Sequence, residues 1–518
     1  MEDWTSLCND KDTEAIVLSK MREIGLSAHL KYAVQSKIKD QNVQISDLEE
    51  TVHASVNTPE LQTLLKNAVY KEVISLQNKV GIDGSELRPL CKEPLDFVRV
   101  AEEEWEATLR QGINTLAIEK NLPLCKERSP SESEQLRRKW NSIGSNFPGL
   151  HEMNPIYSPK DFLEVLTRVR NSNYNPGVDC GGLMKLNVNV KSLTQLRMLF
   201  SSLHPSNLQM ENSLSRNGGV EYNEKAEKVL QHELCPLARE LCKGGCPVGL
   251  RRELWGRALT LNTSSPEHAF VFEELKMSVM KYSLLFEKLL VMDVKKIAAN
   301  DDNFFVFEDN MHQVLLCFLH DNTMLPHFDH LSVTPMKAFK TGHSGDPHYQ
   351  TVYPPSGIIP FHGFSIFLAP LCFMFDRADR LYALFREMYL RYFVHLHCIS
   401  SHPQGILGLC CQFEHLLQCK QPELTEHLRK IGAEPLRMAF DWLMTAFAGH
   451  LETRQLLLLW DRIIGYNTLS LLPVMAVSVF EFRATNLFKA TTLTEAETVL
   501  SDLRCLNILP LLQQTLFM

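Results

Sequence analysis

Histidine and cysteine residues gather in one stretch of the chain, where they would suit metal binding. The set is His395, His397, Cys398, His402, Cys410, Cys411 and His415. A zinc site needs four such ligands in tetrahedral reach. Their spacing matches no standard zinc motif, and the adjacent run Tyr392-Phe393-Val394 is typical of a buried helix. We therefore expect core residues here and no metal site.

Other familiar chemistries also lack their patterns. Cys242 and Cys246 are separated by three residues, which is the wrong spacing for a thioredoxin-like redox pair. The acidic residues Asp301, Asp302 and Asp309 are more typical of solvated helix ends than of a catalytic or metal site. The chain contains no glycine-rich loop of the G-x-x-x-x-G-K-[ST] type. We therefore do not expect it to hydrolyse nucleotides by itself.

The run Gly245-Cys246-Pro247-Val248-Gly249-Leu250-Arg251-Arg252-Glu253-Leu254-Trp255-Gly256 is the most informative in the chain. Pro247 suits the first turn of a helix, because its missing N–H is not needed there. Arg251 and Trp255 are four residues apart, so guanidinium and indole can stack on one helix face. By itself this pattern is equally consistent with an amphipathic helix that exposes an arginine.

Three later motifs follow in a fixed order. They are Leu290-Val291-Met292-Asp293-Val294-Lys295-Lys296, then Pro360-Phe361-His362-Gly363 with Ala369-Pro370-Leu371, and finally Leu459-Trp460-Asp461-Arg462-Ile463-Ile464. Together with the run around Pro247, they resemble the ordered motifs of TBC domains, the helical modules that act on Rab GTPases. The resemblance covers roughly residues 240–485.

The resemblance implies a GTPase-activating protein, a regulator rather than an enzyme with its own substrate turnover. TBC domains supply an arginine and a glutamine in trans to the GTPase, and the matching positions here are Lys296 and His362. Arg251, Trp255, Asp293 and Gly363 would support the groove around them. Pro247, Trp460 and Asp461 would be structural signatures. GTP and Mg²⁺ would be carried by the partner, so the resemblance implies no cofactor.

We call Lys296 and His362, which match the family's arginine and glutamine, the finger positions. Both depart from the family pattern. Lys296 keeps the charge of arginine but loses its planar fork of five donors. His362 offers one donor and one acceptor when neutral, so it can hold a water with a different reach from glutamine. A long connection rich in proline precedes His362 and contains a spare glutamine, Gln350. No glycine and apolar helix follow Gln350 directly, which argues against a catalytic role for it.

Helical periodicity dominates the elements that must position these residues. Apolar stripes of period 3.6 run through Ala15–Ile38, Leu95–Ile118 and Phe162–Val169. In the second half, the predicted helices are Glu224–Cys242, Leu250–Leu261, Ala269–Leu290, Met311–Leu319, Gly363–Phe375, Arg380–Leu396, Ile406–Leu416, Glu423–Ile431, Arg437–Phe447 and Thr453–Ile464. We predict an all-α protein. Its expected parts are a helical region of unknown role (1–204), a polar linker (205–223), a TBC domain (224–490) and a helical extension (491–518).

Composition and charge limit the kinds of binding partner and the cell compartment that we expect. The formal net charge of −8 over 518 residues argues against a dominant nucleic-acid surface. The N-terminus lacks the basic and apolar pattern of a secretory signal, and Leu469–Phe480 is shorter than the roughly 20 residues of a membrane span. The 14 cysteines are scattered singly through helical patterns, as reduced core residues are. We expect a cytoplasmic protein that reaches endomembranes through its Rab partner.

Two alternatives stay open beside the activator. In one, the replaced fingers leave a module that binds or scaffolds a Rab without accelerating hydrolysis. In the other, the chain is a helical interaction protein that does not contact GTPases. Nucleotide-dependent binding without stimulated hydrolysis would favour the first, and absence of binding across a broad Rab set would favour the second.

Overall fold

The computed structural model is an all-α protein whose helices form two compact units, as predicted in class. It describes residues 11–23, 25–38, 45–56, 65, 68–69, 95–140, 155–170, 182–186, 188, 190–206, 218–231, 236–261, 265–300, 304–328, 336–339 and 350–518. One unit comprises residues 1–88, 209–262 and 464–466, and the other comprises 89–208, 263–463 and 467–518.

The smaller unit is built from two groups of helices. Their bounds are α2 (Lys11–Glu23), α3 (Leu26–Ile38), α4 (Ile45–Val56), α10 (Gly218–Leu230), α11 (Leu237–Gly244), the 3₁₀ turn η4 (Val248–Leu250) and α12 (Arg251–Ala258). The last residues of α20 (Thr453–Tyr466) belong to this unit. Gly465 lies against the backbone of α11, where an added Cβ would stand 2.4 Å from the amide nitrogen of Lys243. Only glycine permits that approach.

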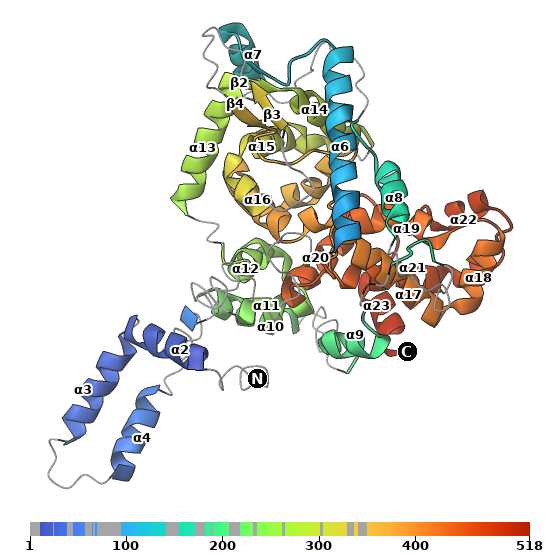
Figure 1. Cartoon of the computed structure of the whole chain (residues 1–518). Coiled ribbons are helices and arrows are strands. Elements are labelled where there is room, and N and C mark those ends of the chain that lie inside the picture. The colour runs from blue at the N-terminus through green and yellow to red at the C-terminus, as the bar shows by residue number, and fades with distance from the viewer. Residues whose placement is uncertain are drawn as a thin grey trace. The chain divides into compact units, whose positions relative to one another are not determined.

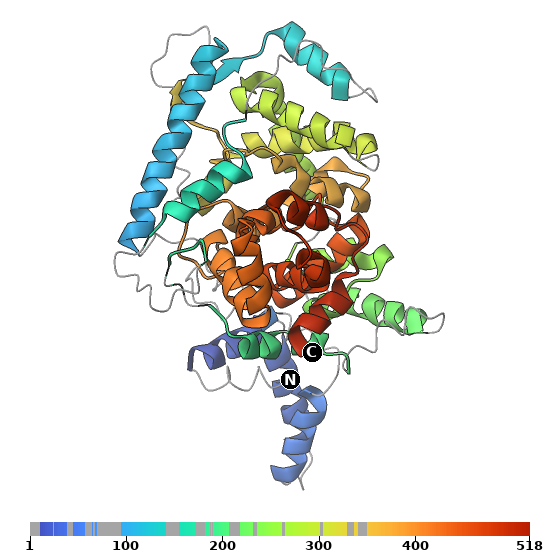
Figure 2. The same cartoon turned by 90° about the vertical axis from the view of Figure 1, so that its right-hand side faces the viewer.

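The larger unit begins with elements from the first half of the chain. They are α6 (Asp96–Glu119), β1 (Cys125–Glu127), α7 (Pro130–Trp140), α8 (Pro159–Arg168), α9 (Leu193–Leu199) and η2 (Ser201–Leu203). Helix α6 buries Val98, Trp105, Leu109, Ile113 and Leu116, the i, i+3/i+4 spacing of an amphipathic helix. It lies beside α8 in both views (Figures 1 and 2).

The rest of the larger unit comes from the second half of the chain. Its elements are α13 (Pro266–Lys281), β2 (Tyr282–Leu284), α14 (Leu285–Asn300), η5 (Phe305–Phe307), α15 (Glu308–His320), η6 (Asn322–Phe328), β3 (Met336–Phe339), β4 (Gln350–Tyr353), η7 (Phe364–Phe367), η8 (Ala369–Met374), α16 (Ala378–Arg391), η9 (Phe393–Leu396), α17 (Ile406–Lys420), α18 (Pro422–Lys430), α19 (Pro435–Met444), most of α20, α21 (Leu471–Leu487), α22 (Leu493–Leu500) and α23 (Ile508–Phe517). Helix α21 is buried from Leu471 to Phe480 and packs against α17 and α23. It forms the centre of the C-terminal core.

Local sequence explains where many helices begin. Ser158 and Ser192 close capping boxes at the starts of α8 and α9, so side chains satisfy N–H groups that the first turn leaves unpaired. Proline occupies the first turn of α8, α13, α18 and α19. The missing N–H costs nothing there, and the fixed φ favours the helix.

Four predicted helices differ from those observed, and one of them, Arg380–Leu396, ends as α16 at Arg391 with the 3₁₀ turn η9 after it. The predicted Glu224–Cys242 helix divides into α10 and α11, and the Ala269–Leu290 helix is broken by strand β2 between α13 and α14. The Gly363–Phe375 segment forms two 3₁₀ turns instead of one helix. There Gly363 adopts a left-handed φ of 97°, and Pro370 removes an N–H from the second turn. The long connection before His362 includes η6 and the antiparallel pair β3–β4.

The compact units do not follow the predicted division of the chain. Residues 89–208 group with the second half, and α10 begins at Gly218, inside the predicted linker 205–223. Residues 207–217 of that linker lie outside the described residues. The reason for the grouping is burial, because segments of the first half supply apolar and polar partners to the second. The functional meaning of the predicted boundaries stays a prediction.

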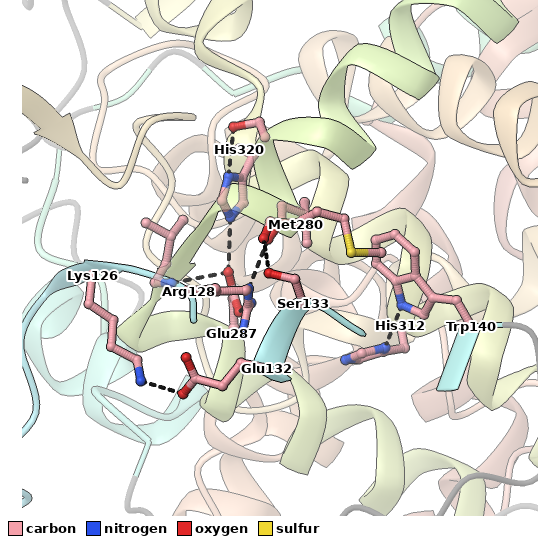
Figure 3. Close-up of polar contacts among 12 residues, drawn as sticks. Lys126, Arg128, Glu132, Ser133, Trp140, Met280, Glu287, His312 and His320 are labelled. Carbon is pink, nitrogen blue, oxygen red and sulfur yellow. Dashed lines mark hydrogen bonds and ion pairs between the residues drawn. The ribbon is translucent and has the colours of Figure 1, made fainter. Parts of the chain in front are cut away.

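A buried carboxylate joins the two halves of the chain within the larger unit. Strand β1 pairs with β2 in antiparallel register, Lys126 opposite Ser283, and Arg128 follows the strand. The Arg128 guanidinium forms an ion pair with Glu287 at the start of α14, and Glu287 also accepts hydrogen bonds from His320 Nε2 at 2.9 Å and from the amide of Leu284 at 3.0 Å (Figure 3). Donors from β1, β2 and α15 or their ends thus meet at one carboxylate.

Further contacts hold the first half in place. Ser133 Oγ donates to the carbonyl of Met280 at 2.8 Å, and Trp140 Nε1 donates to His312 Nδ1 at 3.4 Å (Figure 3). Burial lowers the pKa of His312 to about 4, which keeps its Nδ1 available as an acceptor. On α17, Glu414 accepts the amides of Leu183 and Met184 at 2.7 and 3.0 Å.

The described cysteines and helices bear on two further expectations. Eight of the ten described cysteines are buried, and none of these ten forms a disulfide. This confirms their expected role as small apolar core residues for those eight, while Cys419 and Cys505 are exposed. Within the described part of the chain, every helix is too short or too polar to cross a bilayer.

We predict that Glu287→Gln lowers the free energy of unfolding by about 3 kcal/mol, because removing one partner leaves Arg128 buried without its counter-charge. Chemical denaturation of the full chain measures the change. Glu134→Gln is the matched control, because Glu134 pairs with Arg137 and Arg138 on the exposed face of α7 and should contribute under about 0.5 kcal/mol. Equal effects of the two substitutions would contradict a buried junction.

The stabilisation should also depend on pH. Burial alone would raise the pKa of Glu287, but the Arg128 charge and the His320 hydrogen bond outweigh burial and lower it. A carboxylate with a lowered folded pKa stabilises the fold above its unfolded pKa of about 4.3 and loses that effect as pH falls through the folded value. The difference between wild type and Glu287→Gln should therefore shrink below about pH 4. A gap that stays constant from pH 7 to pH 3 would contradict this.

Candidate functional site

Helix α14 places Asp293 and Lys296 on one face, because residues three apart are neighbours on a helix. Asp293 is 8% exposed, and Lys296, one turn later, lies at the surface. The same helix thus carries one buried acid and one exposed cation side by side.

Asp293 binds the turn that carries His362. Its Oδ1 accepts the amide of Gly363 at 2.7 Å, and its Oδ2 accepts the amide of Ser365 at 2.8 Å. These amides open the 3₁₀ turn η7, so the carboxylate caps a helical N-terminus, where negative charge is favoured. Gly363 can take its φ of 97° without strain because it has no Cβ. The carboxylate therefore fixes the turn to α14.

Lys296 and His362 meet above this junction. Lys296 Nζ lies 2.8 Å from His362 Nε2, and His362 Nδ1 lies 3.6 Å from Asp293 Oδ1. An ammonium group can only donate, so Nε2 must accept and the imidazole proton lies on Nδ1, facing the carboxylate. The His362 side chain is 36% exposed. The structure therefore brings both predicted finger positions to one solvent-accessible point, with Asp293 beneath them.

The backbone of His362 is held from the first half of the chain. Its amide donates to the carbonyl of Tyr157 at 3.0 Å. The preceding residue, Phe361, is buried, with its ring 6.0 Å from that of Tyr157. Tyr157 in turn packs at 5.2 Å against Trp105 of α6. We call Trp105, Tyr157, Phe162 and Phe361 the aromatic anchor.

Sequence analysis missed the aromatic anchor. Phe162 of α8 completes it, with ring distances of 5.6 Å to Trp105 and 6.1 Å to Tyr157. Phe162 also contacts Phe440 of α19 at 6.4 Å. The Ser158-Pro159 helix start was a readable signal for α8, but no local pattern indicates that Tyr157 touches a residue 200 positions later.

The predicted supporting residues Arg251 and Trp255 lie in the smaller unit. Both are buried, at 3% and 0% exposure, and Arg251 Nη2 donates to the carbonyl of Cys246 at 3.3 Å. Pro247 precedes η4, with Arg251 at the start of α12. These contacts stabilise the turn between α11 and α12. Both side chains are core residues, so the alternative of an arginine exposed at position 251 is wrong, and the supporting role of the pair stays a prediction.

Trp460 and Asp461 of α20 are also buried, at 1% and 0% exposure. Trp460 Nε1 donates to the carbonyl of Ala446 at 3.0 Å, and its ring lies 5.2 Å from Phe393. Ala446 and Phe447 have positive φ values of 50° and 64°. The indole bond therefore helps hold a strained turn after α19, which suits a structural signature.

Most of the histidine and cysteine set is buried, while His402 and His415 are partly exposed. His397 Nε2 is 2.6 Å from the Tyr389 hydroxyl, and the rings of His395 and His402 stack at 5.1 Å. Burial lowers the pKa of His395 and of His397 to about 3, so both are neutral. Burial also raises the pKa of the Cys398 thiol. Among the described residues, no three histidine, cysteine or acidic side chains are grouped as metal ligands.

Four candidate residues remain, and the structure describes them only in part. Gln350 begins β4, paired with Phe339 of β3, and its side chain lies outside the described residues. Asp301 and Asp302 also lie outside them. Asp309 occupies the first turn of α15, as expected for a charge at a helix end.

Comparisons with known proteins bear on this site. A sequence profile of the Rab-GTPase-TBC domain matches residues 361–488, beginning one residue before His362. Human "TBC1 domain family member 19" is 41% identical over 516 residues, covering 97% of each chain. The chain belongs to the TBC1 domain family. A solved TBC domain, the flagellar RabGAP of Chlamydomonas, is 14% identical, covers 54% of this chain and 83% of that one, and has a TM-score of 0.39.

The range matched by the TBC profile contains only part of the candidate site. The matched range contains His362, Trp460 and Asp461, whereas α14 with Asp293 and Lys296 lies before it. Those α14 residues reach the matched range through Asp293, which binds the backbone at Gly363 and Ser365. Catalytic roles for Lys296 and His362 stay predictions.

We predict that Trp105→Ala destabilises the full chain by about 3–5 kcal/mol, because it leaves a large cavity in the aromatic anchor. Differential scanning calorimetry and denaturant titration measure the loss. Ile118→Ala is the matched control on the same helix, since Ile118 is 79% exposed and should change stability by under about 0.5 kcal/mol. If Trp105→Ala behaved like the control, α6 would be a dispensable addition to the TBC half.

Proposed function

We propose that this TBC-family chain stimulates GTP hydrolysis by a Rab-type GTPase, with Lys296 and His362 supplied in trans. The observation that carries the proposal is the exposed contact between Lys296 Nζ and His362 Nε2, 2.8 Å long and backed by Asp293. A cation and a water-holding group side by side are what phosphoryl transfer requires from a partner protein. The chain acts as a regulator, and nucleotide and Mg²⁺ belong to the GTPase.

The proposed chemistry divides between the two side chains. Lys296 turns from His362 toward a phosphate oxygen, where its charge offsets the negative charge that develops in the transition state. His362 Nε2 then loses its donor and accepts a hydrogen bond from the attacking water. Asp293, facing Nδ1, keeps the imidazole in the tautomer that leaves Nε2 free. Asp293 acts here as a positioning residue.

The second candidate function is a Rab-binding module without strong catalysis. The same contact favours a binding module, because Lys296 and His362 are hydrogen-bonded to each other. Lysine also lacks the bidentate fork of arginine. In this case nucleotide-dependent binding persists while hydrolysis stays near the GTPase's own rate. For either function we propose a role in vesicle trafficking, with a cytoplasmic protein that meets endomembranes through the membrane-anchored Rab and binds no nucleic acid.

We predict that the full chain accelerates single-turnover GTP hydrolysis by at least one purified Rab. Lys296→Ala and His362→Ala should each reduce the acceleration at least about tenfold, because each removes an interaction made in the transition state. Lys225→Ala, an exposed lysine of α10, is the control and should leave the rate unchanged. The full chain is required, because Tyr157 and Trp105 of the first half support the His362 turn.

Restoring the family residues separates the two candidate functions. Lys296→Arg combined with His362→Gln should raise hydrolysis above wild type if the geometry is that of a weakened activator. If this double variant binds a GTP-loaded Rab but still does not stimulate it, the binding module is the better function. A wild-type chain that neither binds nor stimulates any Rab in a broad panel would leave the helical interaction protein.

A further inference from the structure

An exposed aromatic patch lies on the segments that follow α14 and η7. We call Phe305, Val306 and Phe373 the aromatic patch, and their exposures are 61%, 62% and 48%. Phe373 packs edge-on against Phe307 at 4.8 Å and against Phe304 at 5.9 Å. Phe304 is 4% exposed, so a buried ring anchors the exposed ones. Soluble proteins seldom present anchored apolar side chains together unless something binds there.

The aromatic patch is continuous with the segments that carry the finger positions. Turn η5, with Phe305 and Val306, follows α14 and packs against it, and η8, with Phe373, follows η7 directly. From Lys296 to the end of α14 the helix rises about 6 Å, and four further residues span at most about 14 Å, so Phe304 lies within about 20 Å of Lys296. A standard protein interface of about 800 Å² per partner is wide enough to cover both.

Charge indicates what kind of molecule covers this face. Lys296 is exposed, and His362 accepts its hydrogen bond through Nε2 above the buried Asp293 carboxylate. A face that combines an exposed cation with aromatic side chains suits a partner with an anionic group beside an apolar surface. A second copy of this chain would instead bring the same cation into the interface.

We propose that the aromatic patch is the apolar part of the docking surface for the GTP-loaded Rab-type GTPase. Apolar side chains of the GTPase beside its nucleotide pack on Phe305, Val306 and Phe373, while Lys296 and His362 face the phosphates. Aromatic side chains of this kind commonly dominate the affinity of an interface. The proposal rests on the proposed function, and it assigns affinity to the patch and rate to the finger pair.

The test measures binding and rate separately on the full chain. The Rab from the panel that binds wild type most tightly is loaded with a non-hydrolysable GTP analogue and titrated calorimetrically. Phe305→Ser and Phe373→Ser should each raise Kd at least about tenfold, since a buried aromatic contact is worth about 2 kcal/mol or more. Single-turnover hydrolysis at saturating chain should stay within about twofold of wild type, because the fingers are untouched.

Phe482→Ser is the matched control, because Phe482 is 51% exposed on α21. It should leave Kd unchanged. If Phe305→Ser and Phe373→Ser also leave Kd unchanged while wild type binds, the patch proposal is overturned and the proposed function stands. If wild type binds no Rab, the proposed function fails and the patch proposal fails with it. Loss of a dimer in sedimentation of Phe373→Ser would overturn the proposal in favour of a second copy.

Discussion

The geometry of the candidate site depends on the buried carboxylate of Asp293. A charged oxygen pair away from water must find donors, and here two backbone amides of the His362 turn provide them. Those same amides belong to a 3₁₀ start that has no other cap from its own residues. Each side thus needs the other, and the result fixes the distance between α14 and His362. Lys296 meets His362 because both are attached to this junction.

The first half of the chain takes part in the same unit. The Tyr157 carbonyl accepts a hydrogen bond from the His362 amide, and the Arg128 guanidinium forms an ion pair with Glu287 at the start of α14. One contact supports the turn and the other supports the helix. Cutting the chain at the polar region after residue 204 would therefore expose Phe361 and Glu287.

Lys296 and His362, the pair at the finger positions, have complementary hydrogen-bonding groups. Lysine donates and a neutral histidine accepts, so the two replacements satisfy each other. An arginine and a glutamine at these positions would each present donors, with only the glutamine carbonyl to accept. The Lys296–His362 contact leaves both groups hydrogen-bonded to each other. In the proposed function, a Rab-type GTPase would have to compete for them.

Local patterns in the sequence predict both the fold class and the family of this protein. Periodicity gave the all-α class, and ordered motifs such as Leu459-Trp460-Asp461 gave the family, since both depend on residues close together in the chain. The pairing of Lys296 with His362 and the strand at Tyr282–Leu284, which separates two helices, depend on partners far along the chain. Tyr157 shows the limit most clearly, because a backbone carbonyl carries no sequence signature. Long-range contacts select among locally similar patterns, and only the tertiary structure decides them.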